Sequence, residues 1–454
     1  MQVDNSFFLK GDLCWSASLD SLGAVEDAHL LCLEGKLGGV YKTIPENFRH
    51  LPVKDHSGKL IIPGLTDLHV HAPQFSFRSL GMDLELLDWL NTHTFPEEAK
   101  YRDLGYAREA YGRFIEHVRK GPNTRLCVYA TVHSPATLLL ADMLEESGLV
   151  SFVGKVSMDR NCPANLQEGE ASDDTGEWAD LFLKGHEEGR YKNTFPILTP
   201  RFIPACSDAL MEKITLLQGK HGLPVQSHLS ENRKEVEWVR ELRPQSEHYS
   251  GAYADFGLLG GSVPTIMAHC VLLDDRELKL LAENRVYIAH CPQSNINLSS
   301  GIAPVRRFLE KSIPVGLGSD VAGGVNTSIF RAMTDAIAVS KLHKIFSSPE
   351  PAAPGREAAA EEKPLSIEEA FYLGTAGGGS FFGKLSGSCG PRPSFGPSGS
   401  FEEGWDFDAL VIEDSSLGSG EKRSIRDRLV QAIYLSDDRQ IAEKYAMGRL
   451  INKK

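Results

Sequence analysis

The chain contains eight short apolar runs between residues 60 and 320. Longer charged segments that are compatible with helices separate these runs. The runs span residues 60–71, 125–133, 152–158, 195–202, 224–228, 265–269, 285–290 and 314–320. Continuous apolar strands that alternate with helices are typical of parallel βα units, whose strands are buried on both faces. Eight such units predict an α/β protein built on a closed, distorted (β/α)₈ TIM-like barrel.

The predicted barrel occupies residues 63–385, and the two chain ends differ from it. Residues 1–62 and 400–454 contain short strand-like pieces broken by turn residues, so we expect both ends to meet in a small β-sandwich domain. Residues 386–399 consist mostly of Gly, Pro and Ser, and residues 347–363 are rich in Pro, Ala and Glu. Both segments are interpreted as insertions that form mobile surface loops.

Acidic residues outnumber basic ones, 61 against 48, which gives a net charge of about -13 and a pI near 5.6. Such a charge repels nucleic acid phosphate and anionic membranes, so neither is an expected partner. The chain shows no secretory signal and no apolar stretch long enough to cross a membrane, which favours a cytoplasmic location. The eight cysteines form no C-x-x-C pair and are expected to be reduced thiols.

A His-x-His pair ends the first apolar run, at His69 and His71. Side chains two residues apart in a strand point to the same face. Imidazole is a common ligand of catalytic transition metals. The pair therefore indicates half of a metal site at the carboxyl end of a strand, where barrels of this type place their active sites.

Other strand ends carry chemically suitable groups: His228, with Glu231 three residues later, then His269 and Asp320. A single histidine is more often a core or surface residue than a ligand, but a barrel would bring all of these groups together. Their coincidence at separate strand ends predicts a metal site. His290 ends another run, and its position is compatible with either a structural or a functional role.

Several motifs contain these residues and others near them. They are PGLTDLHVHAPQ at 63–74, LLDWLNTHTFPEE at 86–98, GKVSMD at 154–159, TPRF at 199–202, QSHLSEN at 226–232, MAHC at 267–270, AHCPQSN at 289–295, GLGSDVAGG at 316–324, FDALVI at 407–412 and YLSDDR at 434–439. With these motifs the chain resembles the guanine deaminases of the amidohydrolase superfamily. The His-x-His pair and the final Asp are shared across that superfamily, whereas Gln74, the segment 200–202 and the segment 227–232 are specific to the guanine branch.

The resemblance implies hydrolysis of guanine to xanthine and ammonia, with one zinc ion per subunit held by His69, His71, His228 and Asp320. Asp320 would take a proton from the zinc-activated water, and His269 would donate a hydrogen bond to that water. Glu231 would protonate N3 of guanine and help to deliver a proton to the departing ammonia. The resemblance also implies a homodimer.

Substrate recognition is expected from Gln74 and Arg201, together with the aromatic residues Phe202 and Trp89. The planar guanidinium of Arg201 can donate to acceptors such as O6 and N7 of guanine, and the amide of Gln74 suits the remaining ring edge. Phe202 and Trp89 would pack on the purine face. The full predicted substrate-binding set is Gln74, Arg201, Phe202, His71, His228, Glu231, Asp320 and Trp89.

Three alternatives remain open from the sequence. Lys155, within the third run, could carry a carboxylate that bridges two metals, as in some superfamily members, or could form an ordinary ion pair. The same metal framework could act on another heterocycle, such as a pterin, a triazine or a different purine. The chain could also be a metal-free binding protein with an amidohydrolase fold, but such a protein should have lost ligands, and none is missing. A cysteine-ligand nucleobase deaminase is excluded because the P-C-x-x-C element is absent.

Overall fold

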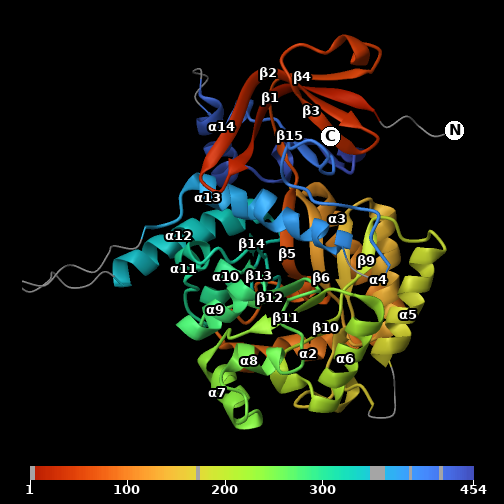
Figure 1. Ribbon diagram of the computed structural model, residues 1–454, viewed down its shortest axis with the longest axis vertical. Helices are drawn as coiled ribbons and strands as arrows, with labels where there is room; N and C mark the ends of the chain where they lie inside the picture. Colours follow the sequence, from red (N-terminus) through yellow and green to blue (C-terminus); the bar gives the residue numbers. More distant parts are fainter. Residues whose placement is uncertain (1–5, 170–173, 348–362, 388–390, 419–422, 454) are drawn as a thin grey trace, which may run out of the picture.

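The computed structural model describes residues 6–169, 174–347, 363–387, 391–418 and 423–453, and it has two parts (Figure 1). A β-rich part at one end of the molecule contains both chain ends, and a larger α/β part contains the remaining elements. None of the helices in these five stretches is long and apolar enough to cross a membrane.

The larger part is a barrel of parallel strands. One half is a sheet in the order β5 (Leu65–His71), β6 (Asn123–Tyr129), β7 (Val150–Gly154) and β9 (Thr194–Pro196). The other half is a sheet in the order β11 (Val225–Leu229), β12 (Thr265–His269), β13 (Tyr287–His290) and β14 (Val315–Leu317). A small pair, β8 (Val156–Ser157) and β10 (Thr199–Pro200), extends β7 and β9 towards their carboxyl ends.

Backbone hydrogen bonds close both seams between the two half-barrels. At one seam, a bridge joins Leu198 to Val225, and the N–H of Leu198 donates to the carbonyl of Pro224 at 2.9 Å. At the other, the N–H of Asp320 donates to the carbonyl of His69 at 2.8 Å, and the N–H of His71 donates to the carbonyl of Val321 at 3.2 Å. The predicted (β/α)₈ barrel is thereby confirmed, and the eight apolar runs supply its strands in order.

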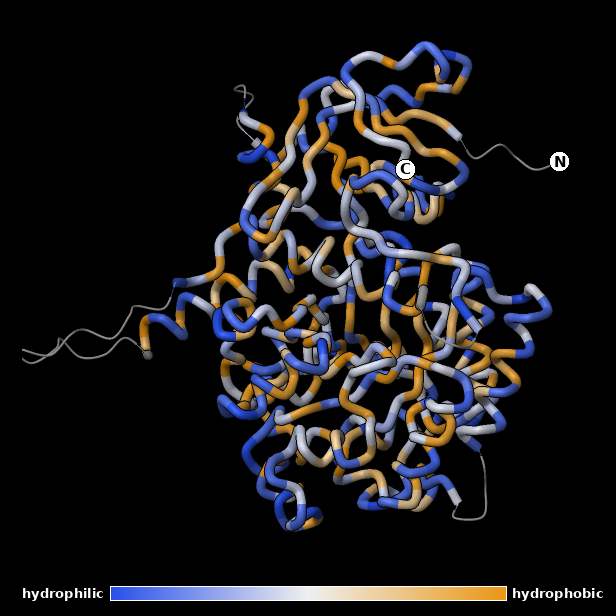
Figure 2. Tube along the Cα trace, viewed as in Figure 1, coloured by the Kyte–Doolittle hydropathy of each residue, from blue (hydrophilic) through white to orange (hydrophobic). Residues whose placement is uncertain are grey.

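Helices surround the barrel strands, and polar residues begin several of them. The side chain of Asp103 accepts hydrogen bonds from the first turn of α3 (Leu104–Lys120). Capping boxes begin α7 (Arg233–Leu242), α9 (Asp275–Glu283) and α13 (Ile367–Tyr372). Apolar colour runs through the barrel strands, whereas much of the outer helices is hydrophilic (Figure 2). The helices are α1 (Leu86–Trp89), α2 (Phe95–Glu98), α3 (Leu104–Lys120), α4 (Ser134–Ser147), α5 (Asp174–Glu187), α6 (Asp208–His221), α7 (Arg233–Leu242), α8 (Tyr249–Ala254), α9 (Asp275–Glu283), α10 (Pro292–Asn297), α11 (Val305–Glu310), α12 (Ile329–Ser347), α13 (Ile367–Tyr372) and α14 (Ile425–Leu435).

Both chain ends meet in the small β-domain, as the sequence predicts, and its strands are hydrogen-bonded into one sheet. Its strand order is β17 (Arg449–Lys453), β16 (Ile441–Ala446), β15 (Ala409–Ile412), β4 (Val53–Pro63), β1 (Phe7–Ser18), β2 (Ser21–Leu33) and β3 (Lys36–Tyr41). The two chain ends join where β15 pairs with β4 in antiparallel register.

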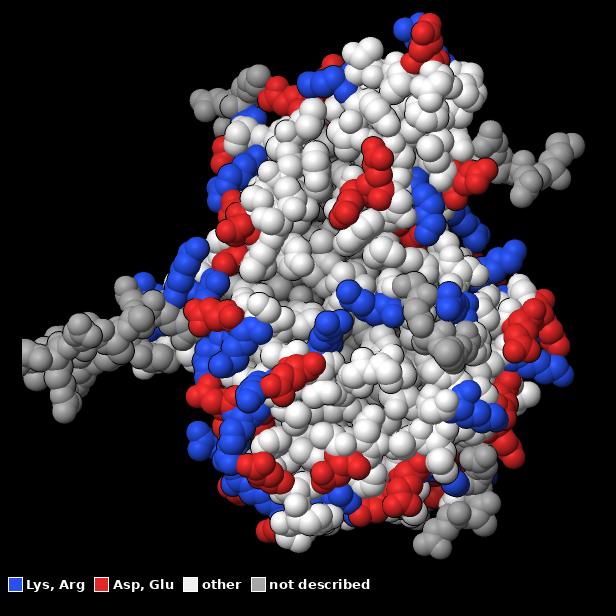
Figure 3. Space-filling view, viewed as in Figure 1, with Lys and Arg blue, Asp and Glu red and all other residues white. Residues whose placement is uncertain are grey.

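On the face of the molecule in Figure 3, Lys and Arg are interspersed with Asp and Glu.

The two predicted insertions are described only in part. Residues 348–362 and 388–390 lie outside the described residues, so the loop predicted at 347–363 is described only at its two ends. Residues 391–399 pack against the barrel instead of forming a free surface loop. Phe395 is buried there, and the carbonyl of Gly396 accepts a hydrogen bond from Nη1 of Arg125 at 2.8 Å.

Candidate active site

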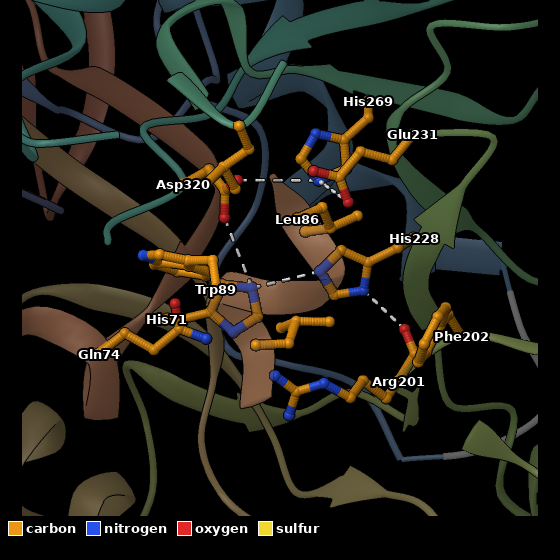
Figure 4. A pocket seen from close by; sticks show the side chains of 12 residues that line it. His71, Gln74, Leu86, Trp89, Arg201, Phe202, His228, Glu231, His269 and Asp320 are labelled. Carbon is orange, nitrogen blue, oxygen red and sulfur yellow. Dashed lines mark hydrogen bonds and ion pairs between the residues drawn. The ribbon is translucent and has the colours of Figure 1, made fainter. Parts of the chain in front are cut away.

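The four predicted metal ligands lie together at the carboxyl ends of the barrel strands, and Figure 4 shows His71, His228 and Asp320 among them. His69 and His71 end β5, His228 lies on β11, and Asp320 follows β14. Oδ1 of Asp320 is 3.1 Å from Nε2 of His69 and 3.5 Å from Nε2 of His71. The ring nitrogens of His69, His71 and His228 lie within 4.8 Å of one another.

The orientation of these rings suits a cation. Nδ1 of His228 donates to the carbonyl of Arg201 at 2.6 Å, which leaves its Nε2 as an acceptor facing Nε2 of His71 at 3.3 Å. Nε2 of His69 is buried and makes no hydrogen bond. Burial, together with the neighbouring rings, lowers the pKa of His71 and of His228 well below the usual range, which favours the neutral, ligating form. Three imidazoles and one carboxylate therefore fit zinc.

A second group of possible ligand atoms also lies within 4.8 Å, and it consists of His69, His269, Cys291 and Asp320. Burial raises the pKa of the Cys291 thiol well above its usual value. A protonated thiol is a poor metal ligand, because the thiolate is the form that binds. The cluster with His71 and His228 is the better metal site.

Glu231, His269 and Asp320 form the rest of the polar site. Nε2 of His269 is 3.5 Å from Oε2 of Glu231 and 3.8 Å from Oδ2 of Asp320, and its Nδ1 is 2.8 Å from Oδ1 of Asn295. Burial raises the pKa of Glu231 well above its usual value, and the nearby carboxylates of Glu235 and Asp320 add to this. Glu231 is therefore suited to hold a proton that it can donate.

Asp320 titrates in the opposite direction. Burial alone would raise the pKa of Asp320. The surrounding histidines, of which His69 has the largest effect, outweigh burial and lower this pKa. The backbone at Asp320 and at His269 has positive φ values of 45° and 71°. Strained backbone of this kind is concentrated at functional sites. Two carboxyl groups with opposite pKa shifts in one cleft provide a base and an acid.

These groups open into a pocket at the carboxyl ends of the barrel strands, where small-molecule sites of such barrels lie. Arg201 and Gln74 lie on one side of it, and the apolar side chains of Leu86 and Trp89 contribute to its wall. All eight predicted substrate-binding residues line the pocket, which is lined by His71, Gln74, Leu86, Trp89, Leu90, Arg201, Phe202, His228, Glu231, His269, Leu298 and Asp320.

Two residues that the sequence left open are placed away from this pocket lining. Lys155 is fully buried, and its Nζ donates to Oε1 of Glu168 at 2.5 Å and to the hydroxyl of Thr175 at 3.2 Å. Its amine is therefore engaged in an ion pair. His290 is also fully buried, and among the described residues it belongs neither to the possible metal groups nor to the pocket lining.

Sequence reasoning assigned no role to Glu98 or Asn295. Glu98 is fully buried and accepts hydrogen bonds from Arg201 and Gln74, and Asn295 contacts Nδ1 of His269. Glu98 lies on a short helix between the first two barrel strands, so the rule that searches strand ends does not find it. The motifs at 86–98 and 289–295 contain both residues and were the available signal.

Comparison with known proteins agrees with this geometry. The profile of the amidohydrolase family matches residues 60–450. The chain is 39% identical to guanine deaminase of Dictyostelium discoideum over 88% of this chain and 84% of that protein, and 32% identical to guanine deaminase of Escherichia coli K12 over 95% and 92%. The crystal structure of guanine deaminase from C. acetobutylicum with bound guanine in the active site is similar with a TM-score of 0.89 and 40% identity, covering 98% of this chain and 100% of that one. The chain is therefore an enzyme of the amidohydrolase family, in its guanine deaminase branch.

Proposed function

We propose that the enzyme hydrolyses guanine to xanthine and ammonia, as part of purine catabolism or salvage. The observation that carries the proposal is a pocket whose lining combines three of the proposed metal ligands, His71, His228 and Asp320, with the carboxyl of Glu231 and the guanidinium of Arg201. The similar structure from C. acetobutylicum, 40% identical to this chain, holds guanine in its active site according to its description.

The proposed metal is one zinc ion, held by His69, His71, His228 and Asp320. Nε2 of His69 is buried, makes no hydrogen bond and lies 3.1 Å from Oδ1 of Asp320; together with the facing nitrogens of His71 and His228 this supports the donor set. When bound, zinc would supply a nucleophile at neutral pH by lowering the pKa of water to about 7.

The protein's own residues would move the protons. Asp320, whose pKa is lowered, accepts a proton from water as the water oxygen bonds to C2 of guanine. His269 orients this water through Nε2. Glu231, whose pKa is raised, donates its proton to N3 of the ring. The proton taken from water then reaches the exocyclic amine with the help of Glu231, the C2–N bond breaks, and ammonia leaves. The proton that remains on the C2 hydroxyl returns to Glu231 as the C2 carbonyl of xanthine forms.

Recognition would come from the opposite wall of the pocket. Arg201 donates hydrogen bonds to O6 and N7 of guanine, and the amide of Gln74 forms hydrogen bonds with the remaining ring edge. Phe202 and Trp89 are both nearly buried and contribute apolar surface for the ring.

The test is to mix the purified protein with guanine and to follow the ultraviolet conversion to xanthine together with ammonia release, before and after treatment with a chelator. Conversion that the chelator abolishes and zinc restores supports the proposal. No conversion by a folded, zinc-replete sample contradicts it, and pterins, triazines and other aminated purines are then assayed in the same way.

Three finer points belong to the same proposal: one zinc ion per subunit, a homodimer in solution and a cytoplasmic location. Metal analysis of the purified protein measures the first. Light scattering on a sizing column measures the second, and cell fractionation measures the third.

A further inference from the structure

A buried carboxylate lies behind the two residues that are proposed to recognise the purine. Glu98 ends the short helix α2, and its side chain is fully buried. Its Oε2 accepts from Nη1 of Arg201 at 2.7 Å, and its Oε1 accepts from Nη2 of Arg201 at 3.1 Å and from Nε2 of Gln74 at 3.1 Å. Glu98 does not line the pocket, whereas Arg201 and Gln74 do.

These contacts fix the direction of both recognition groups. The paired bonds to Glu98 set the plane of the Arg201 guanidinium, and the ring of Phe95 lies 5.2 Å from its Cζ. Gln74 donates from Nε2 to Glu98, and its Oε1 accepts from the N–H of Ala322 at 3.2 Å, so its amide has one favoured orientation. Glu98 therefore orients the donors and acceptors that Arg201 and Gln74 present to the pocket.

The charge of Arg201 gives a second reason why Glu98 matters to the pocket. In the part of the chain that the structure describes, Arg201 is the only lysine or arginine that lines the pocket, and it is nearly fully buried. A buried cation without a partner is costly. Glu98 supplies the carboxylate partner of Arg201, at 2.7 Å from Oε2 of Glu98 to Nη1 of Arg201.

We infer that Glu98 is a positioning residue that sets the preference of the pocket for a purine with a carbonyl at C6. It acts through Arg201 and Gln74 and does not touch the reacting atoms. The inference rests on the proposed function, because it assigns the ring edge that Arg201 reads.

The experiment compares Glu98→Gln with Glu97→Gln, a matched control in the neighbouring residue. Glu97 is also buried, but it pairs with Lys100 and Tyr106 and does not contact Arg201. In Glu98→Gln, the KM for guanine should rise by about tenfold to a hundredfold, because a charged hydrogen-bonded pair is lost, while kcat changes much less. Glu97→Gln should keep both constants close to those of the wild type.

Inhibition by two substrate analogues distinguishes positioning from loosening of the fold. Hypoxanthine has the C6 carbonyl and purine lacks it, and neither has the 2-amino group. Glu98→Gln should raise the Ki of hypoxanthine by about tenfold or more and leave the Ki of purine within about twofold. Equal increases for both, or a KM within twofold of the wild type, overturn the inference.

Two further measurements keep the result decisive. If Glu98→Gln does not fold, Glu98→Asp retains the charge on a side chain one methylene shorter, and an unchanged ratio of the two Ki values in that variant overturns the inference. If the wild type does not deaminate guanine, the proposed function fails instead. Calorimetric titration of wild type and variant with hypoxanthine and purine then tests Glu98 without turnover, and an unchanged affinity ratio overturns the inference.

Discussion

The two ends of the barrel both bury charged and polar groups, but the hydrogen bonding of these groups differs between the ends. At the amino ends of the strands, Arg125 donates from Nε to Asp408, from Nη1 to the carbonyl of Gly396 and from Nη2 to Asp406, each at 2.8 Å. Lys444 donates to three backbone carbonyls between 2.7 and 2.9 Å away. At the carboxyl ends, Nε2 of His69 and Nε2 of His269 are buried without a hydrogen bond.

This difference separates structural charge from functional charge. A buried polar atom without a partner costs about 1–3 kcal/mol, so few folds retain such atoms without a reason. Arg125 and Lys444 connect the barrel to the small domain, and the acceptors of their hydrogen bonds lie within the protein. The histidines of the site are held in place by the strands, while the partner that they need is a ligand. Changes at the two ends should therefore affect different measured quantities.

Glu231→Gln should have the largest effect. The variant keeps the volume and polarity of the side chain but cannot donate a carboxyl proton, so kcat should fall by about a hundredfold to ten-thousandfold. Zinc content and thermal midpoint should remain those of the wild type. Steady-state kinetics and metal analysis measure this, with the exposed Glu237→Gln on α7 as the control. Full activity in Glu231→Gln would show that the acid–base assignment is wrong.

Arg125→Met should act at the other end and on stability instead. It leaves the buried carboxylates of Asp406 and Asp408 without their main cation, which typically costs about 3–5 kcal/mol. Urea unfolding should show this loss, while the KM for guanine of the folded fraction stays unchanged. A variant with normal stability and a raised KM would contradict the division between the two ends.

Arg201→Ala should lie between these two cases. The KM for guanine should rise by about tenfold to a hundredfold with a smaller change in kcat, because a charged hydrogen-bond donor is lost. Glu98 also loses its cation, but the shortened side chain lets pocket water reach it, so the loss of stability should be smaller than in Arg125→Met. The same kinetic and unfolding measurements apply, and a loss of stability equal to that of Arg125→Met would argue against this explanation.

The sequence predicts the strand ends well because a parallel strand is buried on both faces and the chain changes character where the strand stops. His71, His228 and Asp320 were found in this way. Glu98 was not, because it lies between strands in a segment whose charges look like a solvated helix. The role of Arg125 was equally hidden, since its partners Asp406 and Asp408 are about 280 residues away and no local pattern connects them. Local periodicity predicts elements, whereas long-range pairing of buried charges requires the fold.

His290 is the residue that tests the comparison most sharply, because both of its ring nitrogens are buried without a hydrogen bond although, within the described ranges, it belongs neither to the pocket lining nor to the possible metal groups. Burial, with a smaller contribution from His269, lowers its pKa from 6.5 to about 3. The unfolded chain therefore binds a proton between those pH values that the folded protein does not, and stability should fall as the pH falls below about 6.5. At pH 5.5 the loss should be about 1.4 kcal/mol relative to neutral pH.

His290→Leu removes this titration while the metal ligands, whose own response to acid is common to both proteins, stay the same. Urea unfolding of zinc-loaded wild type and variant at pH 7.5 and 5.5 should show a smaller loss in the variant, with kcat and zinc content unchanged. That result would make His290 a stability cost that the barrel interior tolerates, so an atom without a hydrogen bond points to function only where its residue lines the pocket or belongs to the metal-ligand cluster. Loss of zinc or of turnover in His290→Leu would instead place His290 in the active site, and the rule would then hold without that condition.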